Sequence, residues 1–179
     1  KELLAKEYDE KTNEQGGLNE ITSLDFDKQT IAEEVVDKRA KENLNQGATN
    51  AAMISLDAKT GEILAMVGSK DYFDKDIDGN VNVVLRKRQP GSSFKPIVYA
   101  AALMKGFTPQ TTIYDVITNF SASGEAYIPK NFTNKEYGPV TLKKALAGSL
   151  NITAVKVLYL TGIDTVSTLA KDLGYTSLN

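Results

Sequence analysis

The strongest chemical signal in the sequence is a serine three residues before a lysine. Ser92 and Lys95 lie in the segment Arg88–Pro96, whose letters are RQPGSSFKP. A serine hydroxyl becomes a good nucleophile when a base takes its proton, and this chain contains no histidine. The amine of Lys95, one helical turn away, is the remaining local candidate for that base. The pair therefore predicts nucleophilic catalysis by Ser92.

The same spacing also has a purely structural interpretation, in which an N-cap serine is followed by a solvated lysine. The residues around Ser92 favour the catalytic interpretation. Pro90 and Gly91 form a tight turn just before Ser92, and a long apolar run follows it. The free N–H groups and the dipole at a helix N-terminus favour developing negative charge, as an attacked carbonyl requires.

The composition excludes several other kinds of site. The chain has 179 residues, is 41% hydrophobic and 25% charged, and carries a net charge of −2, which is typical of one globular domain or part of a larger one. This near-neutral net charge argues against a surface that binds nucleic acid. Without Cys or His there is no Ser-His-Asp triad, cysteine nucleophile or common zinc site, so no metal or cofactor is expected. Absent cysteine suits an extracytoplasmic protein.

The first part of the chain predicts helices and a β-hairpin. Residues 1–22 are polar and indicate a short helix and a linker, broken at Gln15-Gly16-Gly17. Asp25 or Asp27 can cap a helix that runs to about Leu44, because apolar residues recur there at helical spacing. These residues are Ile31, Ala32, Val35 and Val36.

Two apolar runs, 51–56 and 63–67, flank the turn-rich segment 57–61 and predict a hairpin. Both strands are apolar on nearly every residue, so we expect helices to cover both faces. The acidic segment 71–82 predicts a surface loop.

The elements that position the serine come next. A helix is expected from Ser92 to Met104, with Pro96 in its first turn and Gly106 at its end. Its apolar residues surround most of its circumference, which predicts burial on several sides. Residues 107–138 read as mostly irregular.

Three further helices are expected after this irregular segment. The first covers 142–147 and is interrupted at 148–151. The second covers 154–160, and Asp164 caps a last helix that stops at Gly174.

The segment Arg88–Pro96 resembles the active-site serine motif of penicillin-binding protein transpeptidase domains. The family's partner motif, Ser-x-Asn, matches Ser149-Leu150-Asn151. The residues from Gln15 to Asp25 resemble the linker of bifunctional, class A members. Other segments of the chain also resemble the family, so the resemblance covers nearly the whole sequence. These segments are 57–68, Thr108-Pro109, Pro129-Lys130-Asn131 and 154–156.

The resemblance implies an α+β fold in which an antiparallel sheet packs with a mainly helical subdomain. Residues 1–22 would form a linker segment, and residues 23–179 the N-terminal part of a transpeptidase domain. The family's third motif, Lys-Thr-Gly, follows the serine motifs. Lys59-Thr60-Gly61 precedes them in a hairpin turn, so we interpret it as structural. Ser177-Leu178-Asn179 is interpreted as a chance repeat of Ser-x-Asn. The third motif and the remaining strands are therefore expected outside this chain.

By resemblance, the chain implies a peptidoglycan D,D-transpeptidase that forms an acyl-enzyme on Ser92. Lys95 would be the base, Ser149 a proton relay to the leaving group, and Asn151 would orient Lys95 and bind the substrate backbone. The Ser92 N–H would form half of an oxyanion hole. Lys95 must be neutral to act, which costs an unperturbed lysine about 4–5 kcal/mol at pH 7. Burial and a nearby cation can lower that cost.

The resemblance also implies partners and a location. The partners are stem peptides ending in D-Ala-D-Ala, β-lactam antibiotics and the remainder of the transpeptidase domain. The location is the extracytoplasmic side of the plasma membrane, to which the full-length protein would be anchored. One departure is visible, because Thr153 stands where relatives often carry proline.

Other functions use the same residues. A serine β-lactamase or D,D-carboxypeptidase has both motifs but admits water to the acyl-enzyme, and the linker resemblance argues against this. A non-catalytic penicillin-recognising sensor or scaffold is a further alternative. Asn151 could also be a helix cap or a loop-stabilising side chain.

Overall fold

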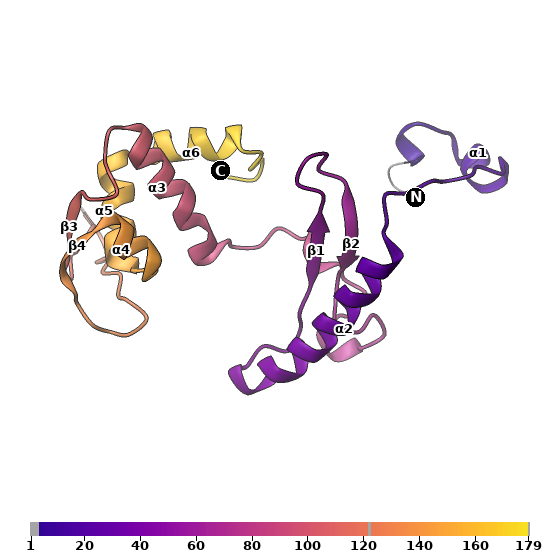
Figure 1. Cartoon of the computed structure of the whole chain (residues 1–179), viewed down its shortest axis with the longest axis horizontal. Helices are drawn as coiled ribbons and strands as arrows, with labels where there is room; N and C mark the ends of the chain where they lie inside the picture. The colour runs from indigo at the N-terminus through magenta and orange to yellow at the C-terminus, as the bar shows by residue number, and fades with distance from the viewer. Residues whose placement is uncertain (1–3, 122, 179) are drawn as a thin grey trace. The chain divides into compact units, whose positions relative to one another are not determined.

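The computed structural model describes residues 4–121 and 123–178, and it contains two compact units, Lys1–Arg86 and Lys87–Asn179 (Figure 1). Each unit is considered separately. Across the described residues, no single helix has the length and apolar character to cross a membrane. The pair of helices Asn151–Thr161 and Ile163–Asp172 meets those criteria only jointly, with a bend of 94° between them.

The first unit begins with short helical segments. The 3₁₀ turn η1 (Leu4–Lys6) precedes α1 (Glu10–Gln15), which agrees with the short helix expected there. The longer helix α2 (Phe26–Asn43) begins after Asp25, whose carboxylate accepts the Lys28 N–H at 3.1 Å. Asp25, and not Asp27, is thus the cap. A 3₁₀ turn, η2 (Leu44–Gln46), follows the helix.

The apolar stripe of α2 is narrower than the sequence indicates. Ala32, Val36 and Ala40 are buried at spacing i, i+4, i+8. Ile31 and Val35 belong to the predicted stripe but are exposed. The neighbouring sheet has only two strands and covers one narrow strip of the helix, along which two of the three buried residues are alanine.

The predicted hairpin is confirmed as strands β1 (Met53–Leu56) and β2 (Ile63–Val67), which pair antiparallel. The carboxylate of Asp57 accepts the N–H groups of Lys59 and Thr60 at 2.8 and 2.9 Å. Gly61 has φ of +76°, a conformation that glycine adopts at little cost. Lys59-Thr60-Gly61 therefore forms the turn, as expected.

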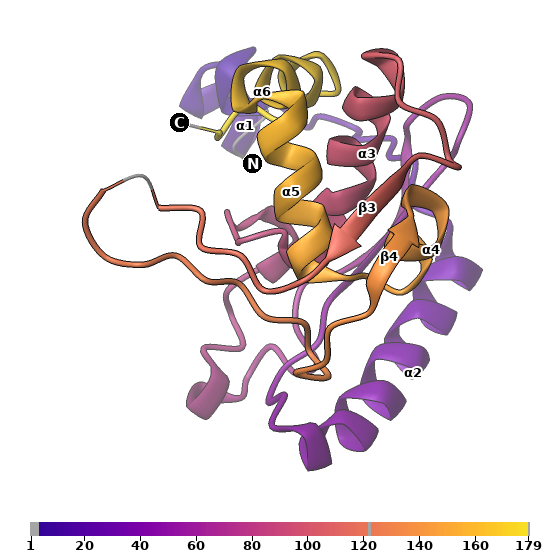
Figure 2. The ribbon, with the colours of Figure 1, turned by 90° about the vertical axis from the view of Figure 1, so that its left-hand side faces the viewer.

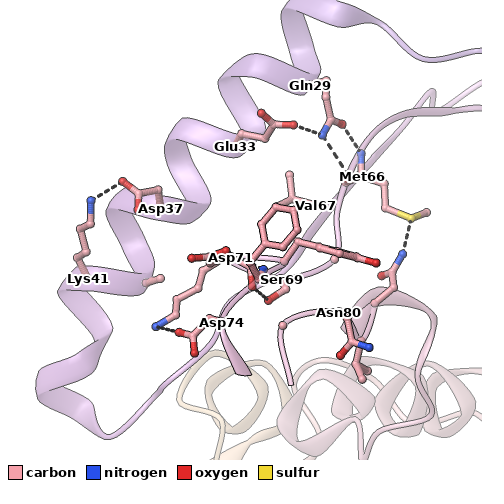
Figure 3. Close-up of a pocket in the computed structure, with 18 of the residues that line it drawn as sticks. Gln29, Glu33, Asp37, Lys41, Met66, Val67, Ser69, Asp71, Asp74 and Asn80 are labelled. Atoms are coloured by element: carbon pink, nitrogen blue, oxygen red, sulfur yellow. Dashed lines mark hydrogen bonds and ion pairs between the residues drawn. The ribbon is translucent and has the colours of Figure 1, made fainter. Parts of the chain in front are cut away.

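One face of the hairpin packs on α2, through buried Ala65 and Val67. The side chain of Gln29 joins the two elements, because it accepts the Met66 N–H at 2.8 Å and donates to the Met66 carbonyl at 3.2 Å (Figure 3). Among the described residues of this unit, no second helix covers the other face of the hairpin, which we had expected to be covered. Several strand residues are correspondingly exposed, namely Met53, Ile54, Leu56 and Ile63.

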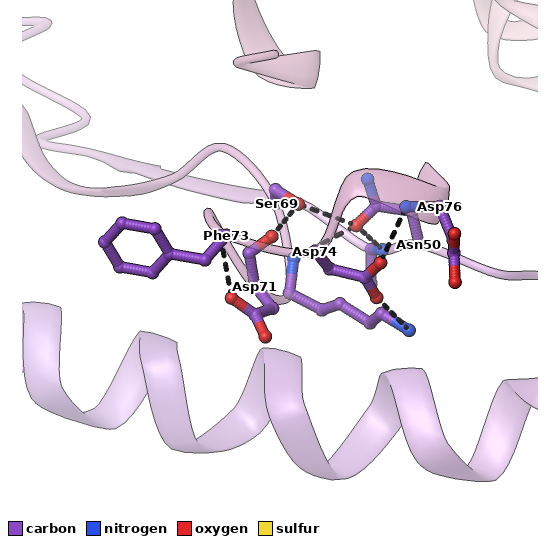
Figure 4. Close-up of polar contacts among 8 residues, drawn as sticks. Asn50, Ser69, Asp71, Phe73, Asp74 and Asp76 are labelled. Carbon is purple, nitrogen blue, oxygen red and sulfur yellow. Dashed lines mark hydrogen bonds and ion pairs between the residues drawn. The ribbon is translucent and has the colours of Figure 1, made fainter. Parts of the chain in front are cut away.

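The acidic segment after β2 is a surface loop, as predicted, with short 3₁₀ turns η3 (Lys75–Ile77) and η4 (Val83–Leu85). Oδ1 of Asn50 accepts the Lys70 N–H at 3.0 Å and the Ser69 hydroxyl at 3.2 Å, so it ties the loop to the segment before β1 (Figure 4). A cavity of about 870 Å³ lies between this loop, β2 and α2 (Figure 3).

The second unit opens with a 3₁₀ turn, η5 (Gly91–Phe94), that continues into α3 (Lys95–Met104). The α-helix was expected to start at Ser92, and this start is wrong by one turn. Gly91 has φ of +55°, and a tight 3₁₀ turn follows it. Pro96 lies in the first turn of α3 and Gly106, at φ of +99°, follows its end, as predicted.

Residues 107–138 are mostly irregular, as expected, but they include one strand that the sequence did not indicate. Strand β3 (Thr112–Asp115) pairs antiparallel with β4 (Gly138–Thr141). Only Ile113 and Asp115 of β3 are buried, and a buried aspartate hides the usual apolar alternation. The loop between the two strands extends from the body of the unit (Figure 2).

Three helices complete the unit: α4 (Leu142–Ala147), α5 (Asn151–Thr161) and α6 (Ile163–Asp172). Helix α5 starts at Asn151 rather than at Ala154. Asp164 was expected to cap α6 but lies in its first turn, and Gly162 occupies the cap position. Gly174, at φ of +94°, follows the end of α6, as predicted.

Helix α3 packs on α4, α5 and α6. Ala102, Ala145 and Val157 are completely buried where these helices meet. The amine of Lys156 donates to the Tyr114 carbonyl at 2.7 Å and joins α5 to β3. This core supports the start of α3, where the predicted nucleophile and base lie.

Candidate active site

The amine of Lys95 brings together the two predicted sequence motifs. Its Nζ donates to the Ser149 carbonyl at 2.5 Å, to Ser149 Oγ at 3.1 Å and to Asn151 Oδ1 at 2.6 Å. An ammonium group has three N–H donors, and these three acceptors match them in number. Three of the four predicted site residues thus meet at one nitrogen.

Lys95 is unusually enclosed for a lysine, with a relative exposure of 9%. Lysine is seldom buried, because removing an ammonium group from water costs free energy. This burial lowers the pKa of Lys95 from its ordinary value of 10.5. The direction is the one that a catalytic base needs, since it reduces the cost of the neutral amine.

Ser92 lies one turn before Lys95 in the exposed 3₁₀ segment, and its carbonyl accepts the Lys95 N–H. Within the described residues, its side chain makes no hydrogen bond with Lys95. The neighbouring hydroxyl of Ser93 instead donates to the Pro90 carbonyl at 2.5 Å and stabilises the turn. Ser92 is therefore the serine of this segment whose hydroxyl is left for another partner.

Ser149 has a strained backbone. Its φ is +50°, a left-handed conformation that few residues other than glycine adopt. The Ser149 and Leu150 N–H groups donate back to carbonyls of α4, at Leu146 and Ala145, both at 3.0 Å. This reversal interrupts the helical path between α4 and α5. It directs both the carbonyl and the hydroxyl of Ser149 toward Lys95.

Asn151 is the first residue of α5, and its side chain points away from the helix backbone. Its Oδ1 accepts from Lys95, and its Nδ2 donates to the Lys130 carbonyl at 2.8 Å. The cap residue of α5 is Leu150, which makes no side-chain cap bond. The interpretation of Asn151 as a helix cap is therefore wrong.

Asn131 supplies the missing cap from the β3–β4 loop. Its Oδ1 accepts the backbone N–H of Asn151 at 2.7 Å and that of Ile152 at 3.3 Å. Asn131 lies in a segment that resembles the family, but the resemblance implied no function for it. No local pattern marks this function, because the N–H groups that Asn131 binds lie about 20 positions later in the sequence.

A buried carboxylate supports Asn131. Asp115, at 0% exposure, accepts from Asn131 Nδ2 at 2.7 Å, from Thr153 Oγ1 at 2.8 Å and from the Tyr137 N–H at 3.1 Å. Asp115 was not among the residues predicted from the sequence, because it lies in the unpredicted strand β3. Thr153 was noted as a departure from relatives, and the structure gives its hydroxyl a buried partner.

Two further segments repeat the letters of the family's motifs. Lys59 belongs to the hairpin turn in the other unit. Of Ser177-Leu178-Asn179, the last residue lies outside the described residues. In the part of the chain that the structure describes, no group of three or more Asp and Glu residues could hold a metal ion.

Comparisons with known proteins agree with this arrangement. The family model for the penicillin-binding protein transpeptidase domain matches residues 51–178. The chain is 41% identical over 134 residues to penicillin-binding protein 1A of Aquifex aeolicus, which covers 71% of this chain and 17% of that protein. It is 38% identical over 169 residues to penicillin-binding protein 2D of Bacillus subtilis, or 92% of this chain and 23% of that protein. The chain thus spans less than a quarter of each relative.

Solved structures give the same result for the fold. The crystal structure of penicillin-binding protein 1A from Haemophilus influenzae matches 71% of this chain and 19% of its own, with 32% identity and a TM-score of 0.65. PonA1 of Mycobacterium tuberculosis in complex with penicillin V matches 99% of this chain and 44% of its own, with a TM-score of 0.79. At 22% identity, the second match concerns the fold alone. With a family match over most of its length and a lysine that joins both predicted motifs, this chain belongs to the penicillin-binding protein transpeptidase domain family.

Proposed function

We propose that this chain carries the acyl-transfer centre of a peptidoglycan D,D-transpeptidase, with Ser92 as the nucleophile. The observation that carries the proposal is the enclosed amine of Lys95, which lies one turn after Ser92 and bonds to both Ser149 and Asn151. A solvated lysine on a helix surface would make none of these contacts. A base that shuttles protons needs neighbours that orient it and pass the proton on.

In the first half-reaction, Ser92 Oγ attacks the carbonyl carbon of the penultimate residue in a peptide that ends in D-Ala-D-Ala. Neutral Lys95 takes the hydroxyl proton as the Oγ–C bond forms. The tetrahedral intermediate then collapses, and the C–N bond to the terminal D-alanine breaks. A proton passes from Lys95 through Ser149 Oγ to the departing amine. The products are free D-alanine and an ester on Ser92.

In the second half-reaction, an amine from a neighbouring stem peptide attacks the ester carbonyl. The C–N bond of the cross-link forms, the C–O bond to Ser92 breaks, and the amine proton returns to Ser92 Oγ through Lys95. Asn151 holds Lys95 in position and offers its amide to the substrate backbone. The Ser92 N–H, at the start of the 3₁₀ turn, donates to the developing oxyanion, an interaction worth about 3–4 kcal/mol in comparable enzymes.

The wider setting follows from the same proposal. A β-lactam would acylate Ser92 in place of the stem peptide. The remainder of the transpeptidase domain would contribute the Lys-Thr/Ser-Gly motif beside residues 23–179, with residues 1–22 as the linker. Peptidoglycan lies outside the plasma membrane, so the proposed location is extracytoplasmic, with the full-length protein anchored to that membrane.

The experiment is covalent labelling of the intact protein by a fluorescent penicillin, followed by peptide mapping. We expect one label, on Ser92, and none in the Ser92→Ala variant. Ser93→Ala is the matched control, because it alters the adjacent hydroxyl and should still take the label. Equal labelling of wild type and Ser92→Ala, or an unlabelled wild type, would overturn the proposed nucleophile. Release of D-alanine with formation of a cross-linked dimer from purified stem peptides separates a transpeptidase from a carboxypeptidase or a non-catalytic sensor.

A further inference from the structure

A chain of buried and part-buried hydrogen bonds runs from the core of the second unit to the amine of Lys95. It begins at Asp115, passes to Asn131, and reaches the backbone of Asn151 at the start of α5. The side chain of Asn151 then accepts from Lys95. All members except Lys95 lie outside the segment that carries Ser92. The network thus connects strand β3, the β3–β4 loop and α5 to the proposed base.

We propose that Asp115 and Asn131 are positioning residues for Asn151 and Lys95, and that Thr153 locks Asp115 in place. The expected effect on the rate of acylation rests on the proposed function. The positioning of Asn151 rests on the hydrogen bonds alone.

Helix α5 has an unusual N-terminal cap. The first N–H groups of a helix need acceptors, and the residue before the helix usually supplies one. Leu150 has no side chain that can do so. Asn131 replaces it from a distance of 20 positions in the sequence and binds two of these N–H groups. The orientation of the first turn of α5, and hence of Asn151, therefore depends on where Asn131 is held.

The side chain of Asn131 is held in one orientation by its contacts. Its relative exposure is 4%, its Nδ2 donates to Asp115 Oδ2 at 2.7 Å, and the same Nδ2 donates to the Lys135 carbonyl at 2.9 Å. With two donor contacts on one side and two accepted bonds on the other, the amide can adopt only one orientation. A flipped amide would point Oδ1 at a carboxylate oxygen and at a carbonyl.

The carboxylate of Asp115 meets a hydrogen-bond donor in each of its three side-chain contacts. It accepts from the Asn131 amide, the Thr153 hydroxyl and the Tyr137 N–H, which is how an ionised carboxylate bonds. Thr153 and Asn151 belong to the same turn of α5. Asp115 therefore holds this turn twice, directly through Thr153 and indirectly through Asn131.

The bond from Thr153 to Asp115 depends on a hydroxyl at this position. Proline, which resembling sequences often carry at the position, has no hydroxyl to donate. Thr153 has a relative exposure of 0%, so its hydroxyl is shielded from solvent, and it donates to Asp115. A buried hydroxyl that lost this partner would remain unsatisfied.

The test uses the intact protein and four variants. Asn131→Ala removes the distant cap, and Thr153→Val removes the hydroxyl while it keeps the shape of the side chain. Thr153→Ser retains the hydroxyl and is the conservative counterpart. Val157→Ala is the matched control for stability, because Val157 is fully buried in α5 but belongs to the apolar core and not to the network.

Two measurements separate positioning from general weakening. Amide hydrogen exchange at Asn151 and Ile152 reports whether the start of α5 is held. The rate constant for acylation by penicillin, measured apart from the dissociation constant of the non-covalent complex, reports whether Lys95 is in place. We expect Asn131→Ala to accelerate both exchange rates and to slow acylation about 100-fold, with little change in the dissociation constant. Thr153→Val should have a smaller effect of the same kind, which Thr153→Ser avoids.

Each contrary result has a distinct meaning. Unchanged exchange at Asn151 and Ile152 in Asn131→Ala would overturn the role of Asn131. Faster exchange with an acylation rate no lower than that of Val157→Ala at equal thermal stability would overturn positioning, since the effect would then be structural only. If the wild type takes no penicillin, the proposed function fails, and the exchange rates still decide whether Asn131 holds the start of α5.

Discussion

Lys95 and Asn151 are 56 positions apart in the sequence, yet Lys95 Nζ lies 2.6 Å from Asn151 Oδ1. Two opposing influences act on the amine. The oxygen of Asn151 stabilises the ammonium form by accepting a hydrogen bond, whereas burial penalises it. The effect of burial is the larger of the two, and the pKa of Lys95 is therefore lowered from its ordinary value of 10.5. The site thus favours the neutral amine more than water does.

The first prediction concerns the pH dependence of acylation. Neutral Lys95 is the proposed base, so acylation of the intact protein should accelerate as pH rises, with a midpoint below 10.5. Asn151→Asp keeps the shape of the side chain and places a negative charge beside the amine. Since an opposite charge favours the ammonium form, this variant should raise the pKa of Lys95, move the midpoint to higher pH and slow acylation at pH 7. The measurement is the rate of penicillin acylation from pH 6 to about 10.

The control for this profile is Lys156→Ala. Lys156 also donates to a backbone carbonyl, at Tyr114, but it makes none of the contacts of the site. Its midpoint should remain that of the wild type. A profile of Asn151→Asp that superimposes on the wild-type profile would show that Lys95 does not control the rate.

The sequence predicted the local elements of the fold well where a repeated apolar pattern or a turn signal was present. The hairpin, helix α2 and the end of α3 are examples, since each depends on residues close together in the chain. Strand β3 was missed because its partner β4 lies beyond a long loop and because its second inward residue is Asp115. A buried aspartate can be recognised only with its donors in place.

The site shows the same division. Ser92 and Lys95 are neighbours in one segment, so their spacing was informative. Ser149 and Asn151 were identified by resemblance, and the hydrogen bonds of Lys95 join them. Asn131 could not be assigned from the sequence, because its function is to cap a helix that starts 20 positions later, and only the folded chain brings the two together.

The second prediction uses the strained backbone of Ser149. Ser149→Ala and Ser149→Gly both remove the hydroxyl that Lys95 contacts at 3.1 Å, so both should slow acylation to a similar extent. They differ in stability. A residue with a Cβ pays about 1 kcal/mol or more for a left-handed conformation, which glycine does not, and Ser149 has φ of +50°. Ser149→Gly should therefore unfold at a higher temperature than Ser149→Ala.

Thermal unfolding and acylation of both variants check this prediction together. If Ser149→Gly unfolds at a lower temperature than Ser149→Ala, the left-handed backbone of residue 149 does not destabilise the fold. If either variant acylates at the wild-type rate, Ser149 is not the proton relay.

The third prediction concerns Lys59-Thr60-Gly61, which has the letters of the family's third motif. Lys59 and Thr60 donate their N–H groups to Asp57 within the hairpin turn. Lys59→Ala retains this backbone bond, so it should leave penicillin acylation and stability unchanged. Gly61→Ala places a Cβ at φ of +76° and should destabilise the hairpin by about 1 kcal/mol. Acylation rates and unfolding midpoints measure these effects, and a large loss of acylation in Lys59→Ala would contradict the structural interpretation.

The last prediction concerns Tyr99 in α3, at 3% exposure. Its hydroxyl is buried without a hydrogen-bond partner among the described residues, and burial, together with the negative charge of Asp115, raises the pKa of Tyr99 to about 12. The unfolded chain loses the same proton near pH 10. Since the folded pKa is the higher one, stability is fully present below pH 10 and is lost as pH rises toward 12, by about 2–3 kcal/mol in all.

Tyr99→Phe removes both the titration and the unsatisfied hydroxyl. At pH 8 we expect it to be about 1 kcal/mol more stable than the wild type, because a buried donor no longer lacks a partner. Between pH 10 and 12 its advantage should grow. Tyr159→Phe is the matched control, since Tyr159 is 74% exposed and the change should have no effect at either pH. Chemical unfolding of the intact protein at pH 8 and 11 gives the comparison, and an advantage of Tyr99→Phe that does not increase with pH would show that this hydroxyl is not held protonated by the fold.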